Sequence, residues 1–406
     1  MKRRKPKIAV VTPAYLPTRA FGGPVTALYN LVKIFQRRGY DLKVYTTDIA
    51  DPTKPDSQNR LPHHEDVDGV TVNRYRAIMS IAGYWITPFL FKDLMRDDYD
   101  IIHAHCARSF QLDLAALVSA IRNKPLIATP HGSVYSYGML GVQGKFHRLA
   151  FEVHNAILKL VLRRAARIIA TSGEEMSQLT RFGVELRKTR LIPNPLDVSE
   201  FAHLPPTGTF RKRFGVNPGD KLILYVGRLA GLKGVDTLIR AFAKISESRT
   251  DVWLFLVGPD DGYLSTVNRL IRELNCSARV RMTGPLYKDS KLEAFVDSDL
   301  VVVPSRYESF GMTALEAFAC SKPVIASFVG GLKELIDDPD TGFFFPPGNA
   351  DELRLVLDRV LDQRDTLERV GKLANDNLQR HYSSEAIEEA VVDVCDSIVA
   401  SEGVGS

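Results

Sequence analysis

The amino-acid sequence predicts an α/β protein built from two doubly wound domains. The chain has 406 residues, and single hydrophobic cores usually split into domains beyond roughly 250–300 residues. Short runs rich in Val, Ile and Leu alternate with helical patterns in both halves. Between the halves lies the proline-rich segment Pro193–Pro206, which is typical of a linker. We therefore expect domains at residues 1–192 and 207–382, a linker at 193–206 and a final helix within 383–406.

Each expected strand is a continuous apolar run, which indicates parallel sheets covered by helices on both faces. Ligands bind beyond the carboxyl ends of the strands in such sheets, so two facing domains would form one cleft. The runs of the first half are Ile8–Thr12, Leu42–Thr47, Val70–Arg74, Ile101–His105, Leu126–Thr129, Ile168–Thr171 and Arg190–Ile192. Those of the second half are Leu222–Val226, Trp253–Val257, Val280–Met282, Leu300–Val303, Val324–Ala326 and Phe343–Phe345.

The net charge of +5 is unevenly distributed along the chain. Residues 1–200 contain 29 Lys and Arg against 18 Asp and Glu, whereas the remainder contains 24 against 30. A basic first half indicates an anionic partner, which is an acidic membrane surface, a phosphorylated lipid or a nucleic acid. No nucleic-acid-binding module is recognisable, so the sequence favours a lipid surface over nucleic acid.

Cysteine spacing and hydropathy predict where the protein works. Cys106, Cys276, Cys320 and Cys395 form no CxxC pair and indicate reduced thiols in a cytosolic protein. The basic N-terminus precedes the apolar run Ile8–Val11, which is too short for the core of a signal peptide. No stretch reaches the ~18 apolar residues of a membrane span. We expect a cytoplasmic protein that touches the inner face of a membrane at most peripherally.

The segment Pro304–Glu316, PSRYESFGMTALE, combines two carboxylates with the start of an expected helix, Thr313–Ala319. Backbone N–H groups at Gly311–Thr313 should point out of the helix start, which favours an anion such as phosphate. Glu308 precedes these amides and Glu316 follows them. Amides that can bind phosphate, next to carboxylates that can bind hydroxyl groups, predict a binding site for a nucleotide sugar. Taken alone, most such pairs are solvated glutamates.

A second motif, GRLAGLKG at Gly227–Gly234, follows the run Leu222–Val226. Arg228 and Lys233 therefore leave the carboxyl end of a strand, just before a helix expected from Val235. Two fixed cations there suit a departing diphosphate, on which negative charge grows in the transition state. An isolated Arg and Lys in a loop are usually solvated, but this position at the sheet edge favours the diphosphate.

Two strand ends in the first half carry further candidates. The loop Pro13–Val25 contains Gly22 and Gly23, which let the backbone approach a phosphate or an acceptor. A tight turn has the same pattern, and the spacing is not the GxGxxG of a dinucleotide site. His131, in TPHG, could bond a sugar hydroxyl or transfer a proton, although structural histidines are commoner.

No metal site is expected. The string HAHC at His103–Cys106 places two histidines on one face of a strand, but no further ligand completes a closed zinc site. We interpret it as a strand end that lines the cleft. The acidic strings Asp66–Asp68 and Asp297–Asp299 are short enough to arise by chance.

Together these motifs resemble those of the family 4 retaining glycosyltransferases, which have the GT-B fold of two Rossmann-like domains facing a cleft. The resemblance rests on the spacing of Glu308 and Glu316 and on the pair Arg228 and Lys233. It extends through ATSGEEMSQL at 170–179, IPNPLD at 192–197, LVGPDDG at 256–262 and PVIASFVGGLKELI at 323–336. Pro195 departs from the family, which commonly has glycine there.

The resemblance implies transfer of a sugar from a UDP- or GDP-sugar to an acceptor hydroxyl, with retention and with no metal or other cofactor. It implies that Arg228 and Lys233 neutralise the diphosphate and that Glu308 contacts the donor sugar. By the same resemblance Glu316 binds the ribose and His131 orients the sugar. The remaining implied donor contacts are Gly22, Gly23, Phe310, Gly311, Met312 and Thr313. The final helix is implied to return to the first domain.

The acceptor is less defined. The basic first half favours a glycolipid, a lipid-linked oligosaccharide or a growing surface polysaccharide, held by the loops Pro13–Gly23 and Ser133–Gly144. The segment Phe146–Arg167 reads mostly as a core helix, although a basic amphipathic helix also lies on anionic lipid. Two alternatives stay open, a sugar-nucleotide epimerase on the same fold and a non-catalytic sugar-nucleotide-binding subunit.

Overall fold

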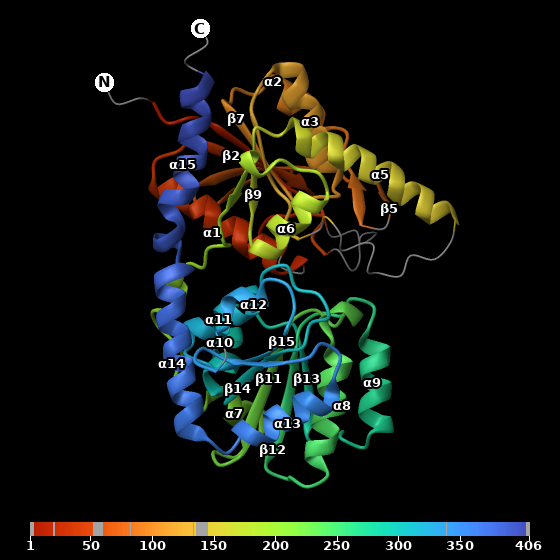
Figure 1. Ribbon diagram of the computed structural model, residues 1–406, viewed down its shortest axis with the longest axis vertical. Coiled ribbons are helices and arrows are strands. Elements are labelled where there is room, and N and C mark those ends of the chain that lie inside the picture. The colour runs from red at the N-terminus through yellow and green to blue at the C-terminus, as the bar shows by residue number, and fades with distance from the viewer. Residues whose placement is uncertain are drawn as a thin grey trace. The chain divides into compact units, whose positions relative to one another are not determined.

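The structure is a computed structural model that describes residues 4–18, 21–51, 60–81, 83–132, 134, 145–337 and 339–402. The chain divides into two compact units, residues 1–195 with 387–406 and residues 196–386. Each unit contains a predominantly parallel sheet with helices on both sides (Figure 1). Each is therefore a Rossmann-like α/β domain, as the alternation of apolar runs and helical patterns predicts.

The first unit is built on an eight-stranded sheet in the order β10-β9-β8-β7-β1-β2-β4-β3. Its strands are β1 Ile8–Val11, β2 Leu42–Thr47, β3 His64–Val67, β4 Val70–Tyr75, β7 Ile101–His105, β8 Leu126–Thr129, β9 Arg167–Ala170 and β10 Thr189–Leu191. Only β3 runs antiparallel to its neighbour among these described strands. A separate hairpin consists of β5 Met79–Ile81 and β6 Tyr84–Ile86.

Successive side chains of β1 point to opposite faces of this sheet, and both faces are buried. Ile8 and Val10 join a core shared with helix α1, whereas Ala9 and Val11 join a core shared with α2, α3 and α5. The helices of the unit are α1 Gly23–Arg37, α2 Leu90–Arg96, α3 Phe110–Arg122, α5 Lys145–Arg164, α6 Gly173–Arg181 and α15 Ser384–Glu402. None of the helices in the described ranges has both the length and the apolar content needed to cross a membrane.

Helix α15, although last in the chain, packs on the first unit beside α1 (Figure 1). Val391, Cys395 and Ile398 are buried in the same core as β1. Ion pairs flank that core: Glu388 lies 3.2 Å from the Arg37 guanidinium and 2.6 Å from Nε of Arg38, and Asp396 lies 2.9 Å from Lys5 Nζ. The end of the chain thus completes the helical cover of one face of the first sheet.

The second unit contains a six-stranded parallel sheet in the order β13-β12-β11-β14-β15-β16. The strands are β11 Lys221–Val226, β12 Val252–Val257, β13 Val280–Gly284, β14 Leu300–Val303, β15 Val324–Ser327 and β16 Phe343–Phe345. The helices are α7 Thr209–Phe214, α8 Val235–Ser246, α9 Leu264–Glu273, α10 Lys288–Asp297, α11 Met312–Ala319, α12 Leu332–Leu335, α13 Ala350–Val360 and α14 Arg364–His381. Because β11 and β14 are neighbours, the loops that follow them emerge at the same edge of the sheet.

Every strand expected from an apolar run is present, with ends within two residues of those expected. Three strands in the described part of the chain were not expected. They are β3, which is polar, and the two three-residue strands β5 and β6.

Candidate active site

Helix α11 begins at the amides that the sequence predicts to bind phosphate. Gly311 caps the helix with φ 117°, and a Cβ there would lie 2.7 Å from the Leu332 side chain. The first amides of any helix have no acceptor within it, so those of Met312 and Thr313 point out of the helix start. The Thr313 hydroxyl donates to the carbonyl oxygen of Val226 at 3.2 Å, which ties α11 to the end of β11.

Lys233 and Glu308, which are 75 positions apart, form a direct ion pair with Nζ and Oε2 2.6 Å apart. Their side chains are only 26% and 14% exposed. The two loops approach closely because Gly234 has φ 64° and no side chain: a Cβ there would lie 1.9 Å from the backbone oxygen of Pro304. Ser305 holds the same Glu308 oxygen by donating its hydroxyl at 3.2 Å.

A second glycine pair supports Glu308 from behind. A Cβ on Gly330 would lie 1.7 Å from the backbone oxygen of Glu308, and the amide of Gly331 donates to that oxygen at 3.1 Å. Arg306 braces the other side, because its amide donates to the carbonyl of Leu232 at 2.8 Å. The position of the Glu308 backbone is thus fixed by two segments of the second unit, Gly330–Gly331 and the loop that contains Leu232.

Arg228 and Glu316 lie at the same sheet edge, but each pairs with a residue that sequence reasoning did not select. The Arg228 guanidinium contacts the Asp261 carboxylate, and both side chains are 39% exposed. Glu316 is largely buried, and its Oε1 lies 2.7 Å from Nζ of Lys291 on α10. Sequence spacing does not reveal the pairing of Glu316 with Lys291, whereas Asp261 lies in the LVGPDDG string that contributes to the family resemblance.

The edge of the second sheet therefore combines a helix start, two cations and two carboxylates, all supplied by the loops after β11 and β14 and by helix α11. The cations can neutralise a diphosphate, and the carboxylates can accept hydrogen bonds from sugar hydroxyls. Each of the four charged groups has a counter-ion in the unit. A ligand would therefore exchange existing ion pairs instead of meeting bare charges.

In the first unit, His131 follows β8 and is 9% exposed. Its backbone has φ 53°, a left-handed conformation that is uncommon outside glycine. Its Nε2 lies 3.0 Å from Nδ1 of His105. Burial lowers the pKa of His131 to about 4, so the imidazole is neutral near pH 7.

Gly22 and Gly23 stand at the start of α1, after β1, at the same edge of the first sheet as His131. Gly22 has φ 78° and caps the helix, and Pro24 occupies its first turn. Apart from Val134, the loop Ser133–Gly144 that we expected to hold the acceptor lies outside the described residues.

HAHC is a strand end, as expected, because β7 ends at His105, but the prediction that its histidines line a cleft is wrong. His103 and His105 are fully buried inside the first unit. The Nε2 of His103 lies 2.9 Å from the Thr129 hydroxyl, and the two histidine rings have centroids 4.2 Å apart. Burial lowers the pKa of His103 to about 3 and that of His105 well below its usual range. Within the described part of the chain, no group of three or more His, Cys, Asp or Glu side chains is arranged to hold a metal ion.

Comparison with known proteins gives the family. A model described as "Glycosyltransferase Family 4" matches residues 21–200, and one described as "Glycosyl transferases group 1" matches residues 207–376. A protein named D-inositol 3-phosphate glycosyltransferase from Kribbella flavida is 30% identical over 69% of this chain and 67% of its own. The chain belongs to the family 4, or group 1, glycosyltransferases. A protein named as an uncharacterized glycosyltransferase from Methanocaldococcus jannaschii is 29% identical over 96% of this chain and 97% of its own.

Solved structures place this glycosyltransferase in the GT-B fold. A sucrose-phosphate synthase from Thermosynechococcus elongatus has a TM-score of 0.76 and 25% identity, covering 98% of this chain and all of that one. HepE of Anabaena, solved in complex with UDP-glucose, also has a TM-score of 0.76, at 21% identity over 97% of this chain and all of its own. The predicted family and fold class are thereby confirmed.

Proposed function

We propose that this glycosyltransferase moves a sugar from a UDP- or GDP-sugar to an acceptor hydroxyl, with retention at the anomeric carbon. The contact between Lys233 and Glu308 carries the proposal. A cation that holds the departing diphosphate, beside a carboxylate that supports positive charge near the anomeric carbon, is what glycosyl transfer requires. The HepE structures were solved with UDP, with UDP and glucose, or with UDP-glucose, which supports a uridine nucleotide as the first donor to test.

In this proposal the charged groups of the second unit divide the donor between them. Arg228 and Lys233 neutralise the diphosphate, which also meets the amides of Phe310–Thr313 at the start of α11. Glu316 accepts hydrogen bonds from the ribose hydroxyls, with Lys291 holding its carboxylate in place. The two cations supply the charge that a metal ion supplies elsewhere, so no metal or other cofactor is required.

The first unit contributes to the sugar and the acceptor. His131 orients the donor sugar, and Gly22 and Gly23 let the backbone pass close to the phosphate. The acceptor proton goes to the leaving phosphate oxygen, so no dedicated protein base is needed. Exclusion of water during transfer limits hydrolysis of the donor.

A donor and acceptor screen tests the proposal. UDP-, GDP- and ADP-sugars would be incubated with inositol phosphate and malate, acceptors that the names of relatives indicate, and with lipid-linked and polysaccharide acceptors. We expect product only when donor and acceptor are both present, with an anomeric proton coupling in the NMR spectrum that matches the donor. Conversion of the donor without acceptor would indicate an epimerase, and donor binding without turnover would indicate a binding subunit. Inverted product would refute retention.

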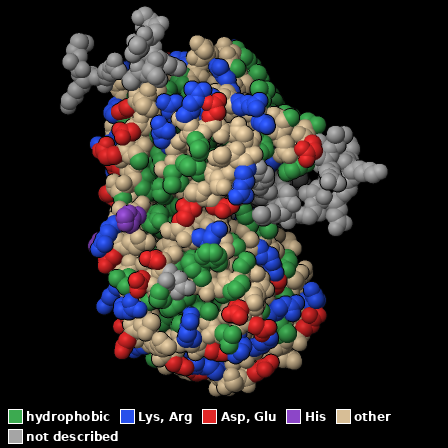
Figure 2. All heavy atoms as spheres, in the orientation of Figure 1, with side chains coloured by type: hydrophobic (Ala, Val, Ile, Leu, Met, Phe, Trp, Pro, Cys, Tyr) green, Lys and Arg blue, Asp and Glu red, His purple; other side chains and the backbone are tan. Residues whose placement is uncertain are grey.

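We also propose that helix α5 contacts anionic lipid in the cytoplasm. One part of its apolar face, Leu158, Val161 and Leu162, is buried in the core of the first unit. Another part is exposed, with Val153 at 53%, Ile157 at 43% and Leu160 at 71%. Lys159, Arg163 and Arg164 lie exposed beside it. Hydrophobic and basic side chains adjoin on the surface where α3 and α5 run (Figures 1 and 2). Exposed apolar residues beside cations are typical of helices that bind an anionic membrane surface.

Vesicle co-sedimentation tests this contact. Leu160→Glu should reduce binding to vesicles of anionic phosphatidylglycerol, because it places a negative charge in the apolar stripe. Leu355→Glu is the control, since Leu355 is 50% exposed on α13 of the second unit. Unchanged binding of Leu160→Glu, or equal binding to neutral phosphatidylcholine vesicles, would contradict the proposal.

A further inference from the structure

Two motifs that the proposed function leaves unused, HAHC and ATSGEEMSQL, meet at His131. Strand β7 carries His103 and His105 on one face and lies beside β8, which leads into His131. The Nδ1 of His105 is 3.0 Å from the Nε2 of His131. The two rings are stacked with an angle of 24° between their planes and 5.3 Å between their centroids. The His131 ring is therefore held by a hydrogen bond to the buried imidazole of His105.

Glu175, from the second motif, holds the backbone at the same place. Its side chain is almost fully buried and accepts hydrogen bonds from the amide of Gly132 and from the amide and hydroxyl of Thr171, the latter two at 2.7 and 2.8 Å. His131 and Gly132 have φ of 53° and 74°, so two consecutive residues are left-handed. A left-handed residue other than glycine persists only where its surroundings hold it. The Glu175 carboxylate supplies that support.

The loss of stability caused by unpaired nitrogen atoms in these histidines argues against a role in core packing alone. Nδ1 of His103, Nε2 of His105 and Nδ1 of His131 are buried and have no hydrogen-bond partner among the described residues. An unpaired buried polar atom destabilises a fold by about 1–3 kcal/mol, and an apolar side chain in its place would avoid that. Three such atoms on touching rings are typical of a functional site, where strain and unpaired groups are retained.

We infer that His105 and Glu175 are positioning residues for His131, and that His105 selects its tautomer. The inference rests on the proposed function, in which His131 contacts the donor sugar. All three imidazoles are neutral, so the hydrogen bond between His105 and His131 needs one donor and one acceptor. Whichever nitrogen of His105 carries the proton therefore decides whether Nδ1 of His131 donates or accepts. By holding the backbone beside His131, Glu175 fixes the distance between the His105 and His131 rings across which the tautomer is selected.

The test is the nitrogen-15 NMR spectrum of histidine-labelled full-length protein, in which the imidazole shifts distinguish the two neutral tautomers. In the wild type we expect one tautomer for His131, assigned by its loss in His131→Gln. His105→Leu should give averaged shifts for His131, whereas His105→Asn, whose amide reaches the position of Nδ1, should restore one tautomer. Glu175→Gln should also give averaged shifts while circular dichroism shows a folded protein.

The role of His105 would be overturned if the His131 shifts were unchanged in His105→Leu. It would also be overturned if they were averaged in both His105→Leu and His105→Asn. Unchanged shifts in Glu175→Gln would overturn the role of Glu175. These spectra need no donor, so their failure is distinct from failure of the proposed function. With the donor found in the screen, His105→Leu should lower kcat about 10- to 100-fold, because a small misplacement of a contact group has that effect. His105→Asn should recover most of the loss.

Discussion

Replacing Lys233 by methionine removes the cation that the proposal places on the diphosphate, while it keeps most of the side chain's length. In the free protein this lysine lies 2.6 Å from Glu308, and both side chains are mostly buried. Glu308 would keep the hydroxyl of Ser305 as a donor at 3.2 Å. A charge-assisted hydrogen bond contributes about 1.5–3 kcal/mol, and partial exposure reduces this to about 1 kcal/mol of stability. For a unit of this size, the melting temperature should fall by about 2–4 °C.

Nucleotide binding should change much more than stability. If the proposal holds, the variant loses a charge-assisted hydrogen bond to the phosphate, about 1.5–3 kcal/mol, which corresponds to a Kd about 10- to 150-fold weaker. Glu308 would also face the phosphate without its counter-ion. The double variant Lys233→Met/Glu308→Gln should therefore bind the nucleotide more tightly than Lys233→Met alone.

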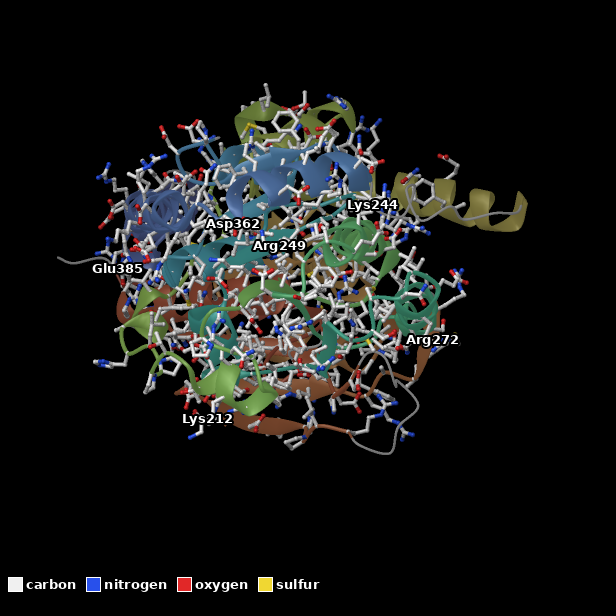
Figure 3. The ribbon with its side chains drawn as sticks, turned by 90° about the horizontal axis from the view of Figure 1, so that it is seen from below. Lys212, Lys244, Arg249, Arg272, Asp362 and Glu385 are labelled. Carbon is white, nitrogen blue, oxygen red and sulfur yellow. The ribbon has the colours of Figure 1, made fainter. Side chains whose placement is uncertain are left out.

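Calorimetry with UDP and GDP measures these affinities, and thermal melts measure the stability. Lys244→Met is the matched control. Lys244 lies in the last turn of α8, the helix that Lys233 precedes, and pairs with Asp351 of α13; Lys244 is labelled in Figure 3. We expect this control to bind nucleotide like the wild type. If Lys233→Met binds as tightly as the wild type although its melting temperature falls, Lys233 is only a structural partner of Glu308 and the reasoning is refuted.

Three further predictions concern the same machinery. Glu316→Gln should weaken nucleotide binding in calorimetry, whereas Glu308→Gln should lower kcat about 100- to 1,000-fold with nucleotide affinity nearly unchanged; equal effects of both on binding alone would contradict this division. Gly234→Ala should lower the free energy of unfolding by at least about 1–3 kcal/mol in urea melts, because its Cβ would lie 1.9 Å from a neighbouring backbone oxygen at φ 64°. Gly219→Ala, whose Cβ would meet no atom within 4 Å, should change it by less than about 0.5 kcal/mol. Burial lowers the pKa of His131 from 6.5 to about 4, so the stability contributed by the neutral imidazole is present above pH 6.5 and is lost as pH falls from 6.5 toward 4. Melting temperatures that do not fall over this pH range, or that fall equally in His131→Gln, would contradict this role of His131.

The strands and the main motifs could be predicted because their signals are local. A short apolar run such as Leu300–Val303, which leads directly into a proline, favours a buried strand, and the loop after such a strand emerges at the carboxyl edge of the sheet. Strand β3, HEDV, could not be predicted this way. It is a polar edge strand whose only ladder partner in the described sheet is β4, so pairing and not burial makes it a strand.

The partners of the site residues could not be predicted for a different reason. Lys291 and Glu316 stand on separate helices, and only the packing of α10 and α11 beside one sheet brings their charged atoms to 2.7 Å. The residue pattern of a strand also does not determine whether one of its faces points into the core or toward a cleft. His103 and His105 share a face of β7, as alternation predicts, but that face points into the core.

The most direct test of the central claim is calorimetric titration of the purified protein with UDP, GDP and ADP, without added metal, beside the variant Arg228→Ala. The account predicts that one nucleotide binds selectively and that the variant loses most of that affinity, because the proposal assigns the diphosphate to fixed cations of the second unit. Absence of binding for all three nucleotides by well-folded protein, or equal affinity in the variant, would contradict it.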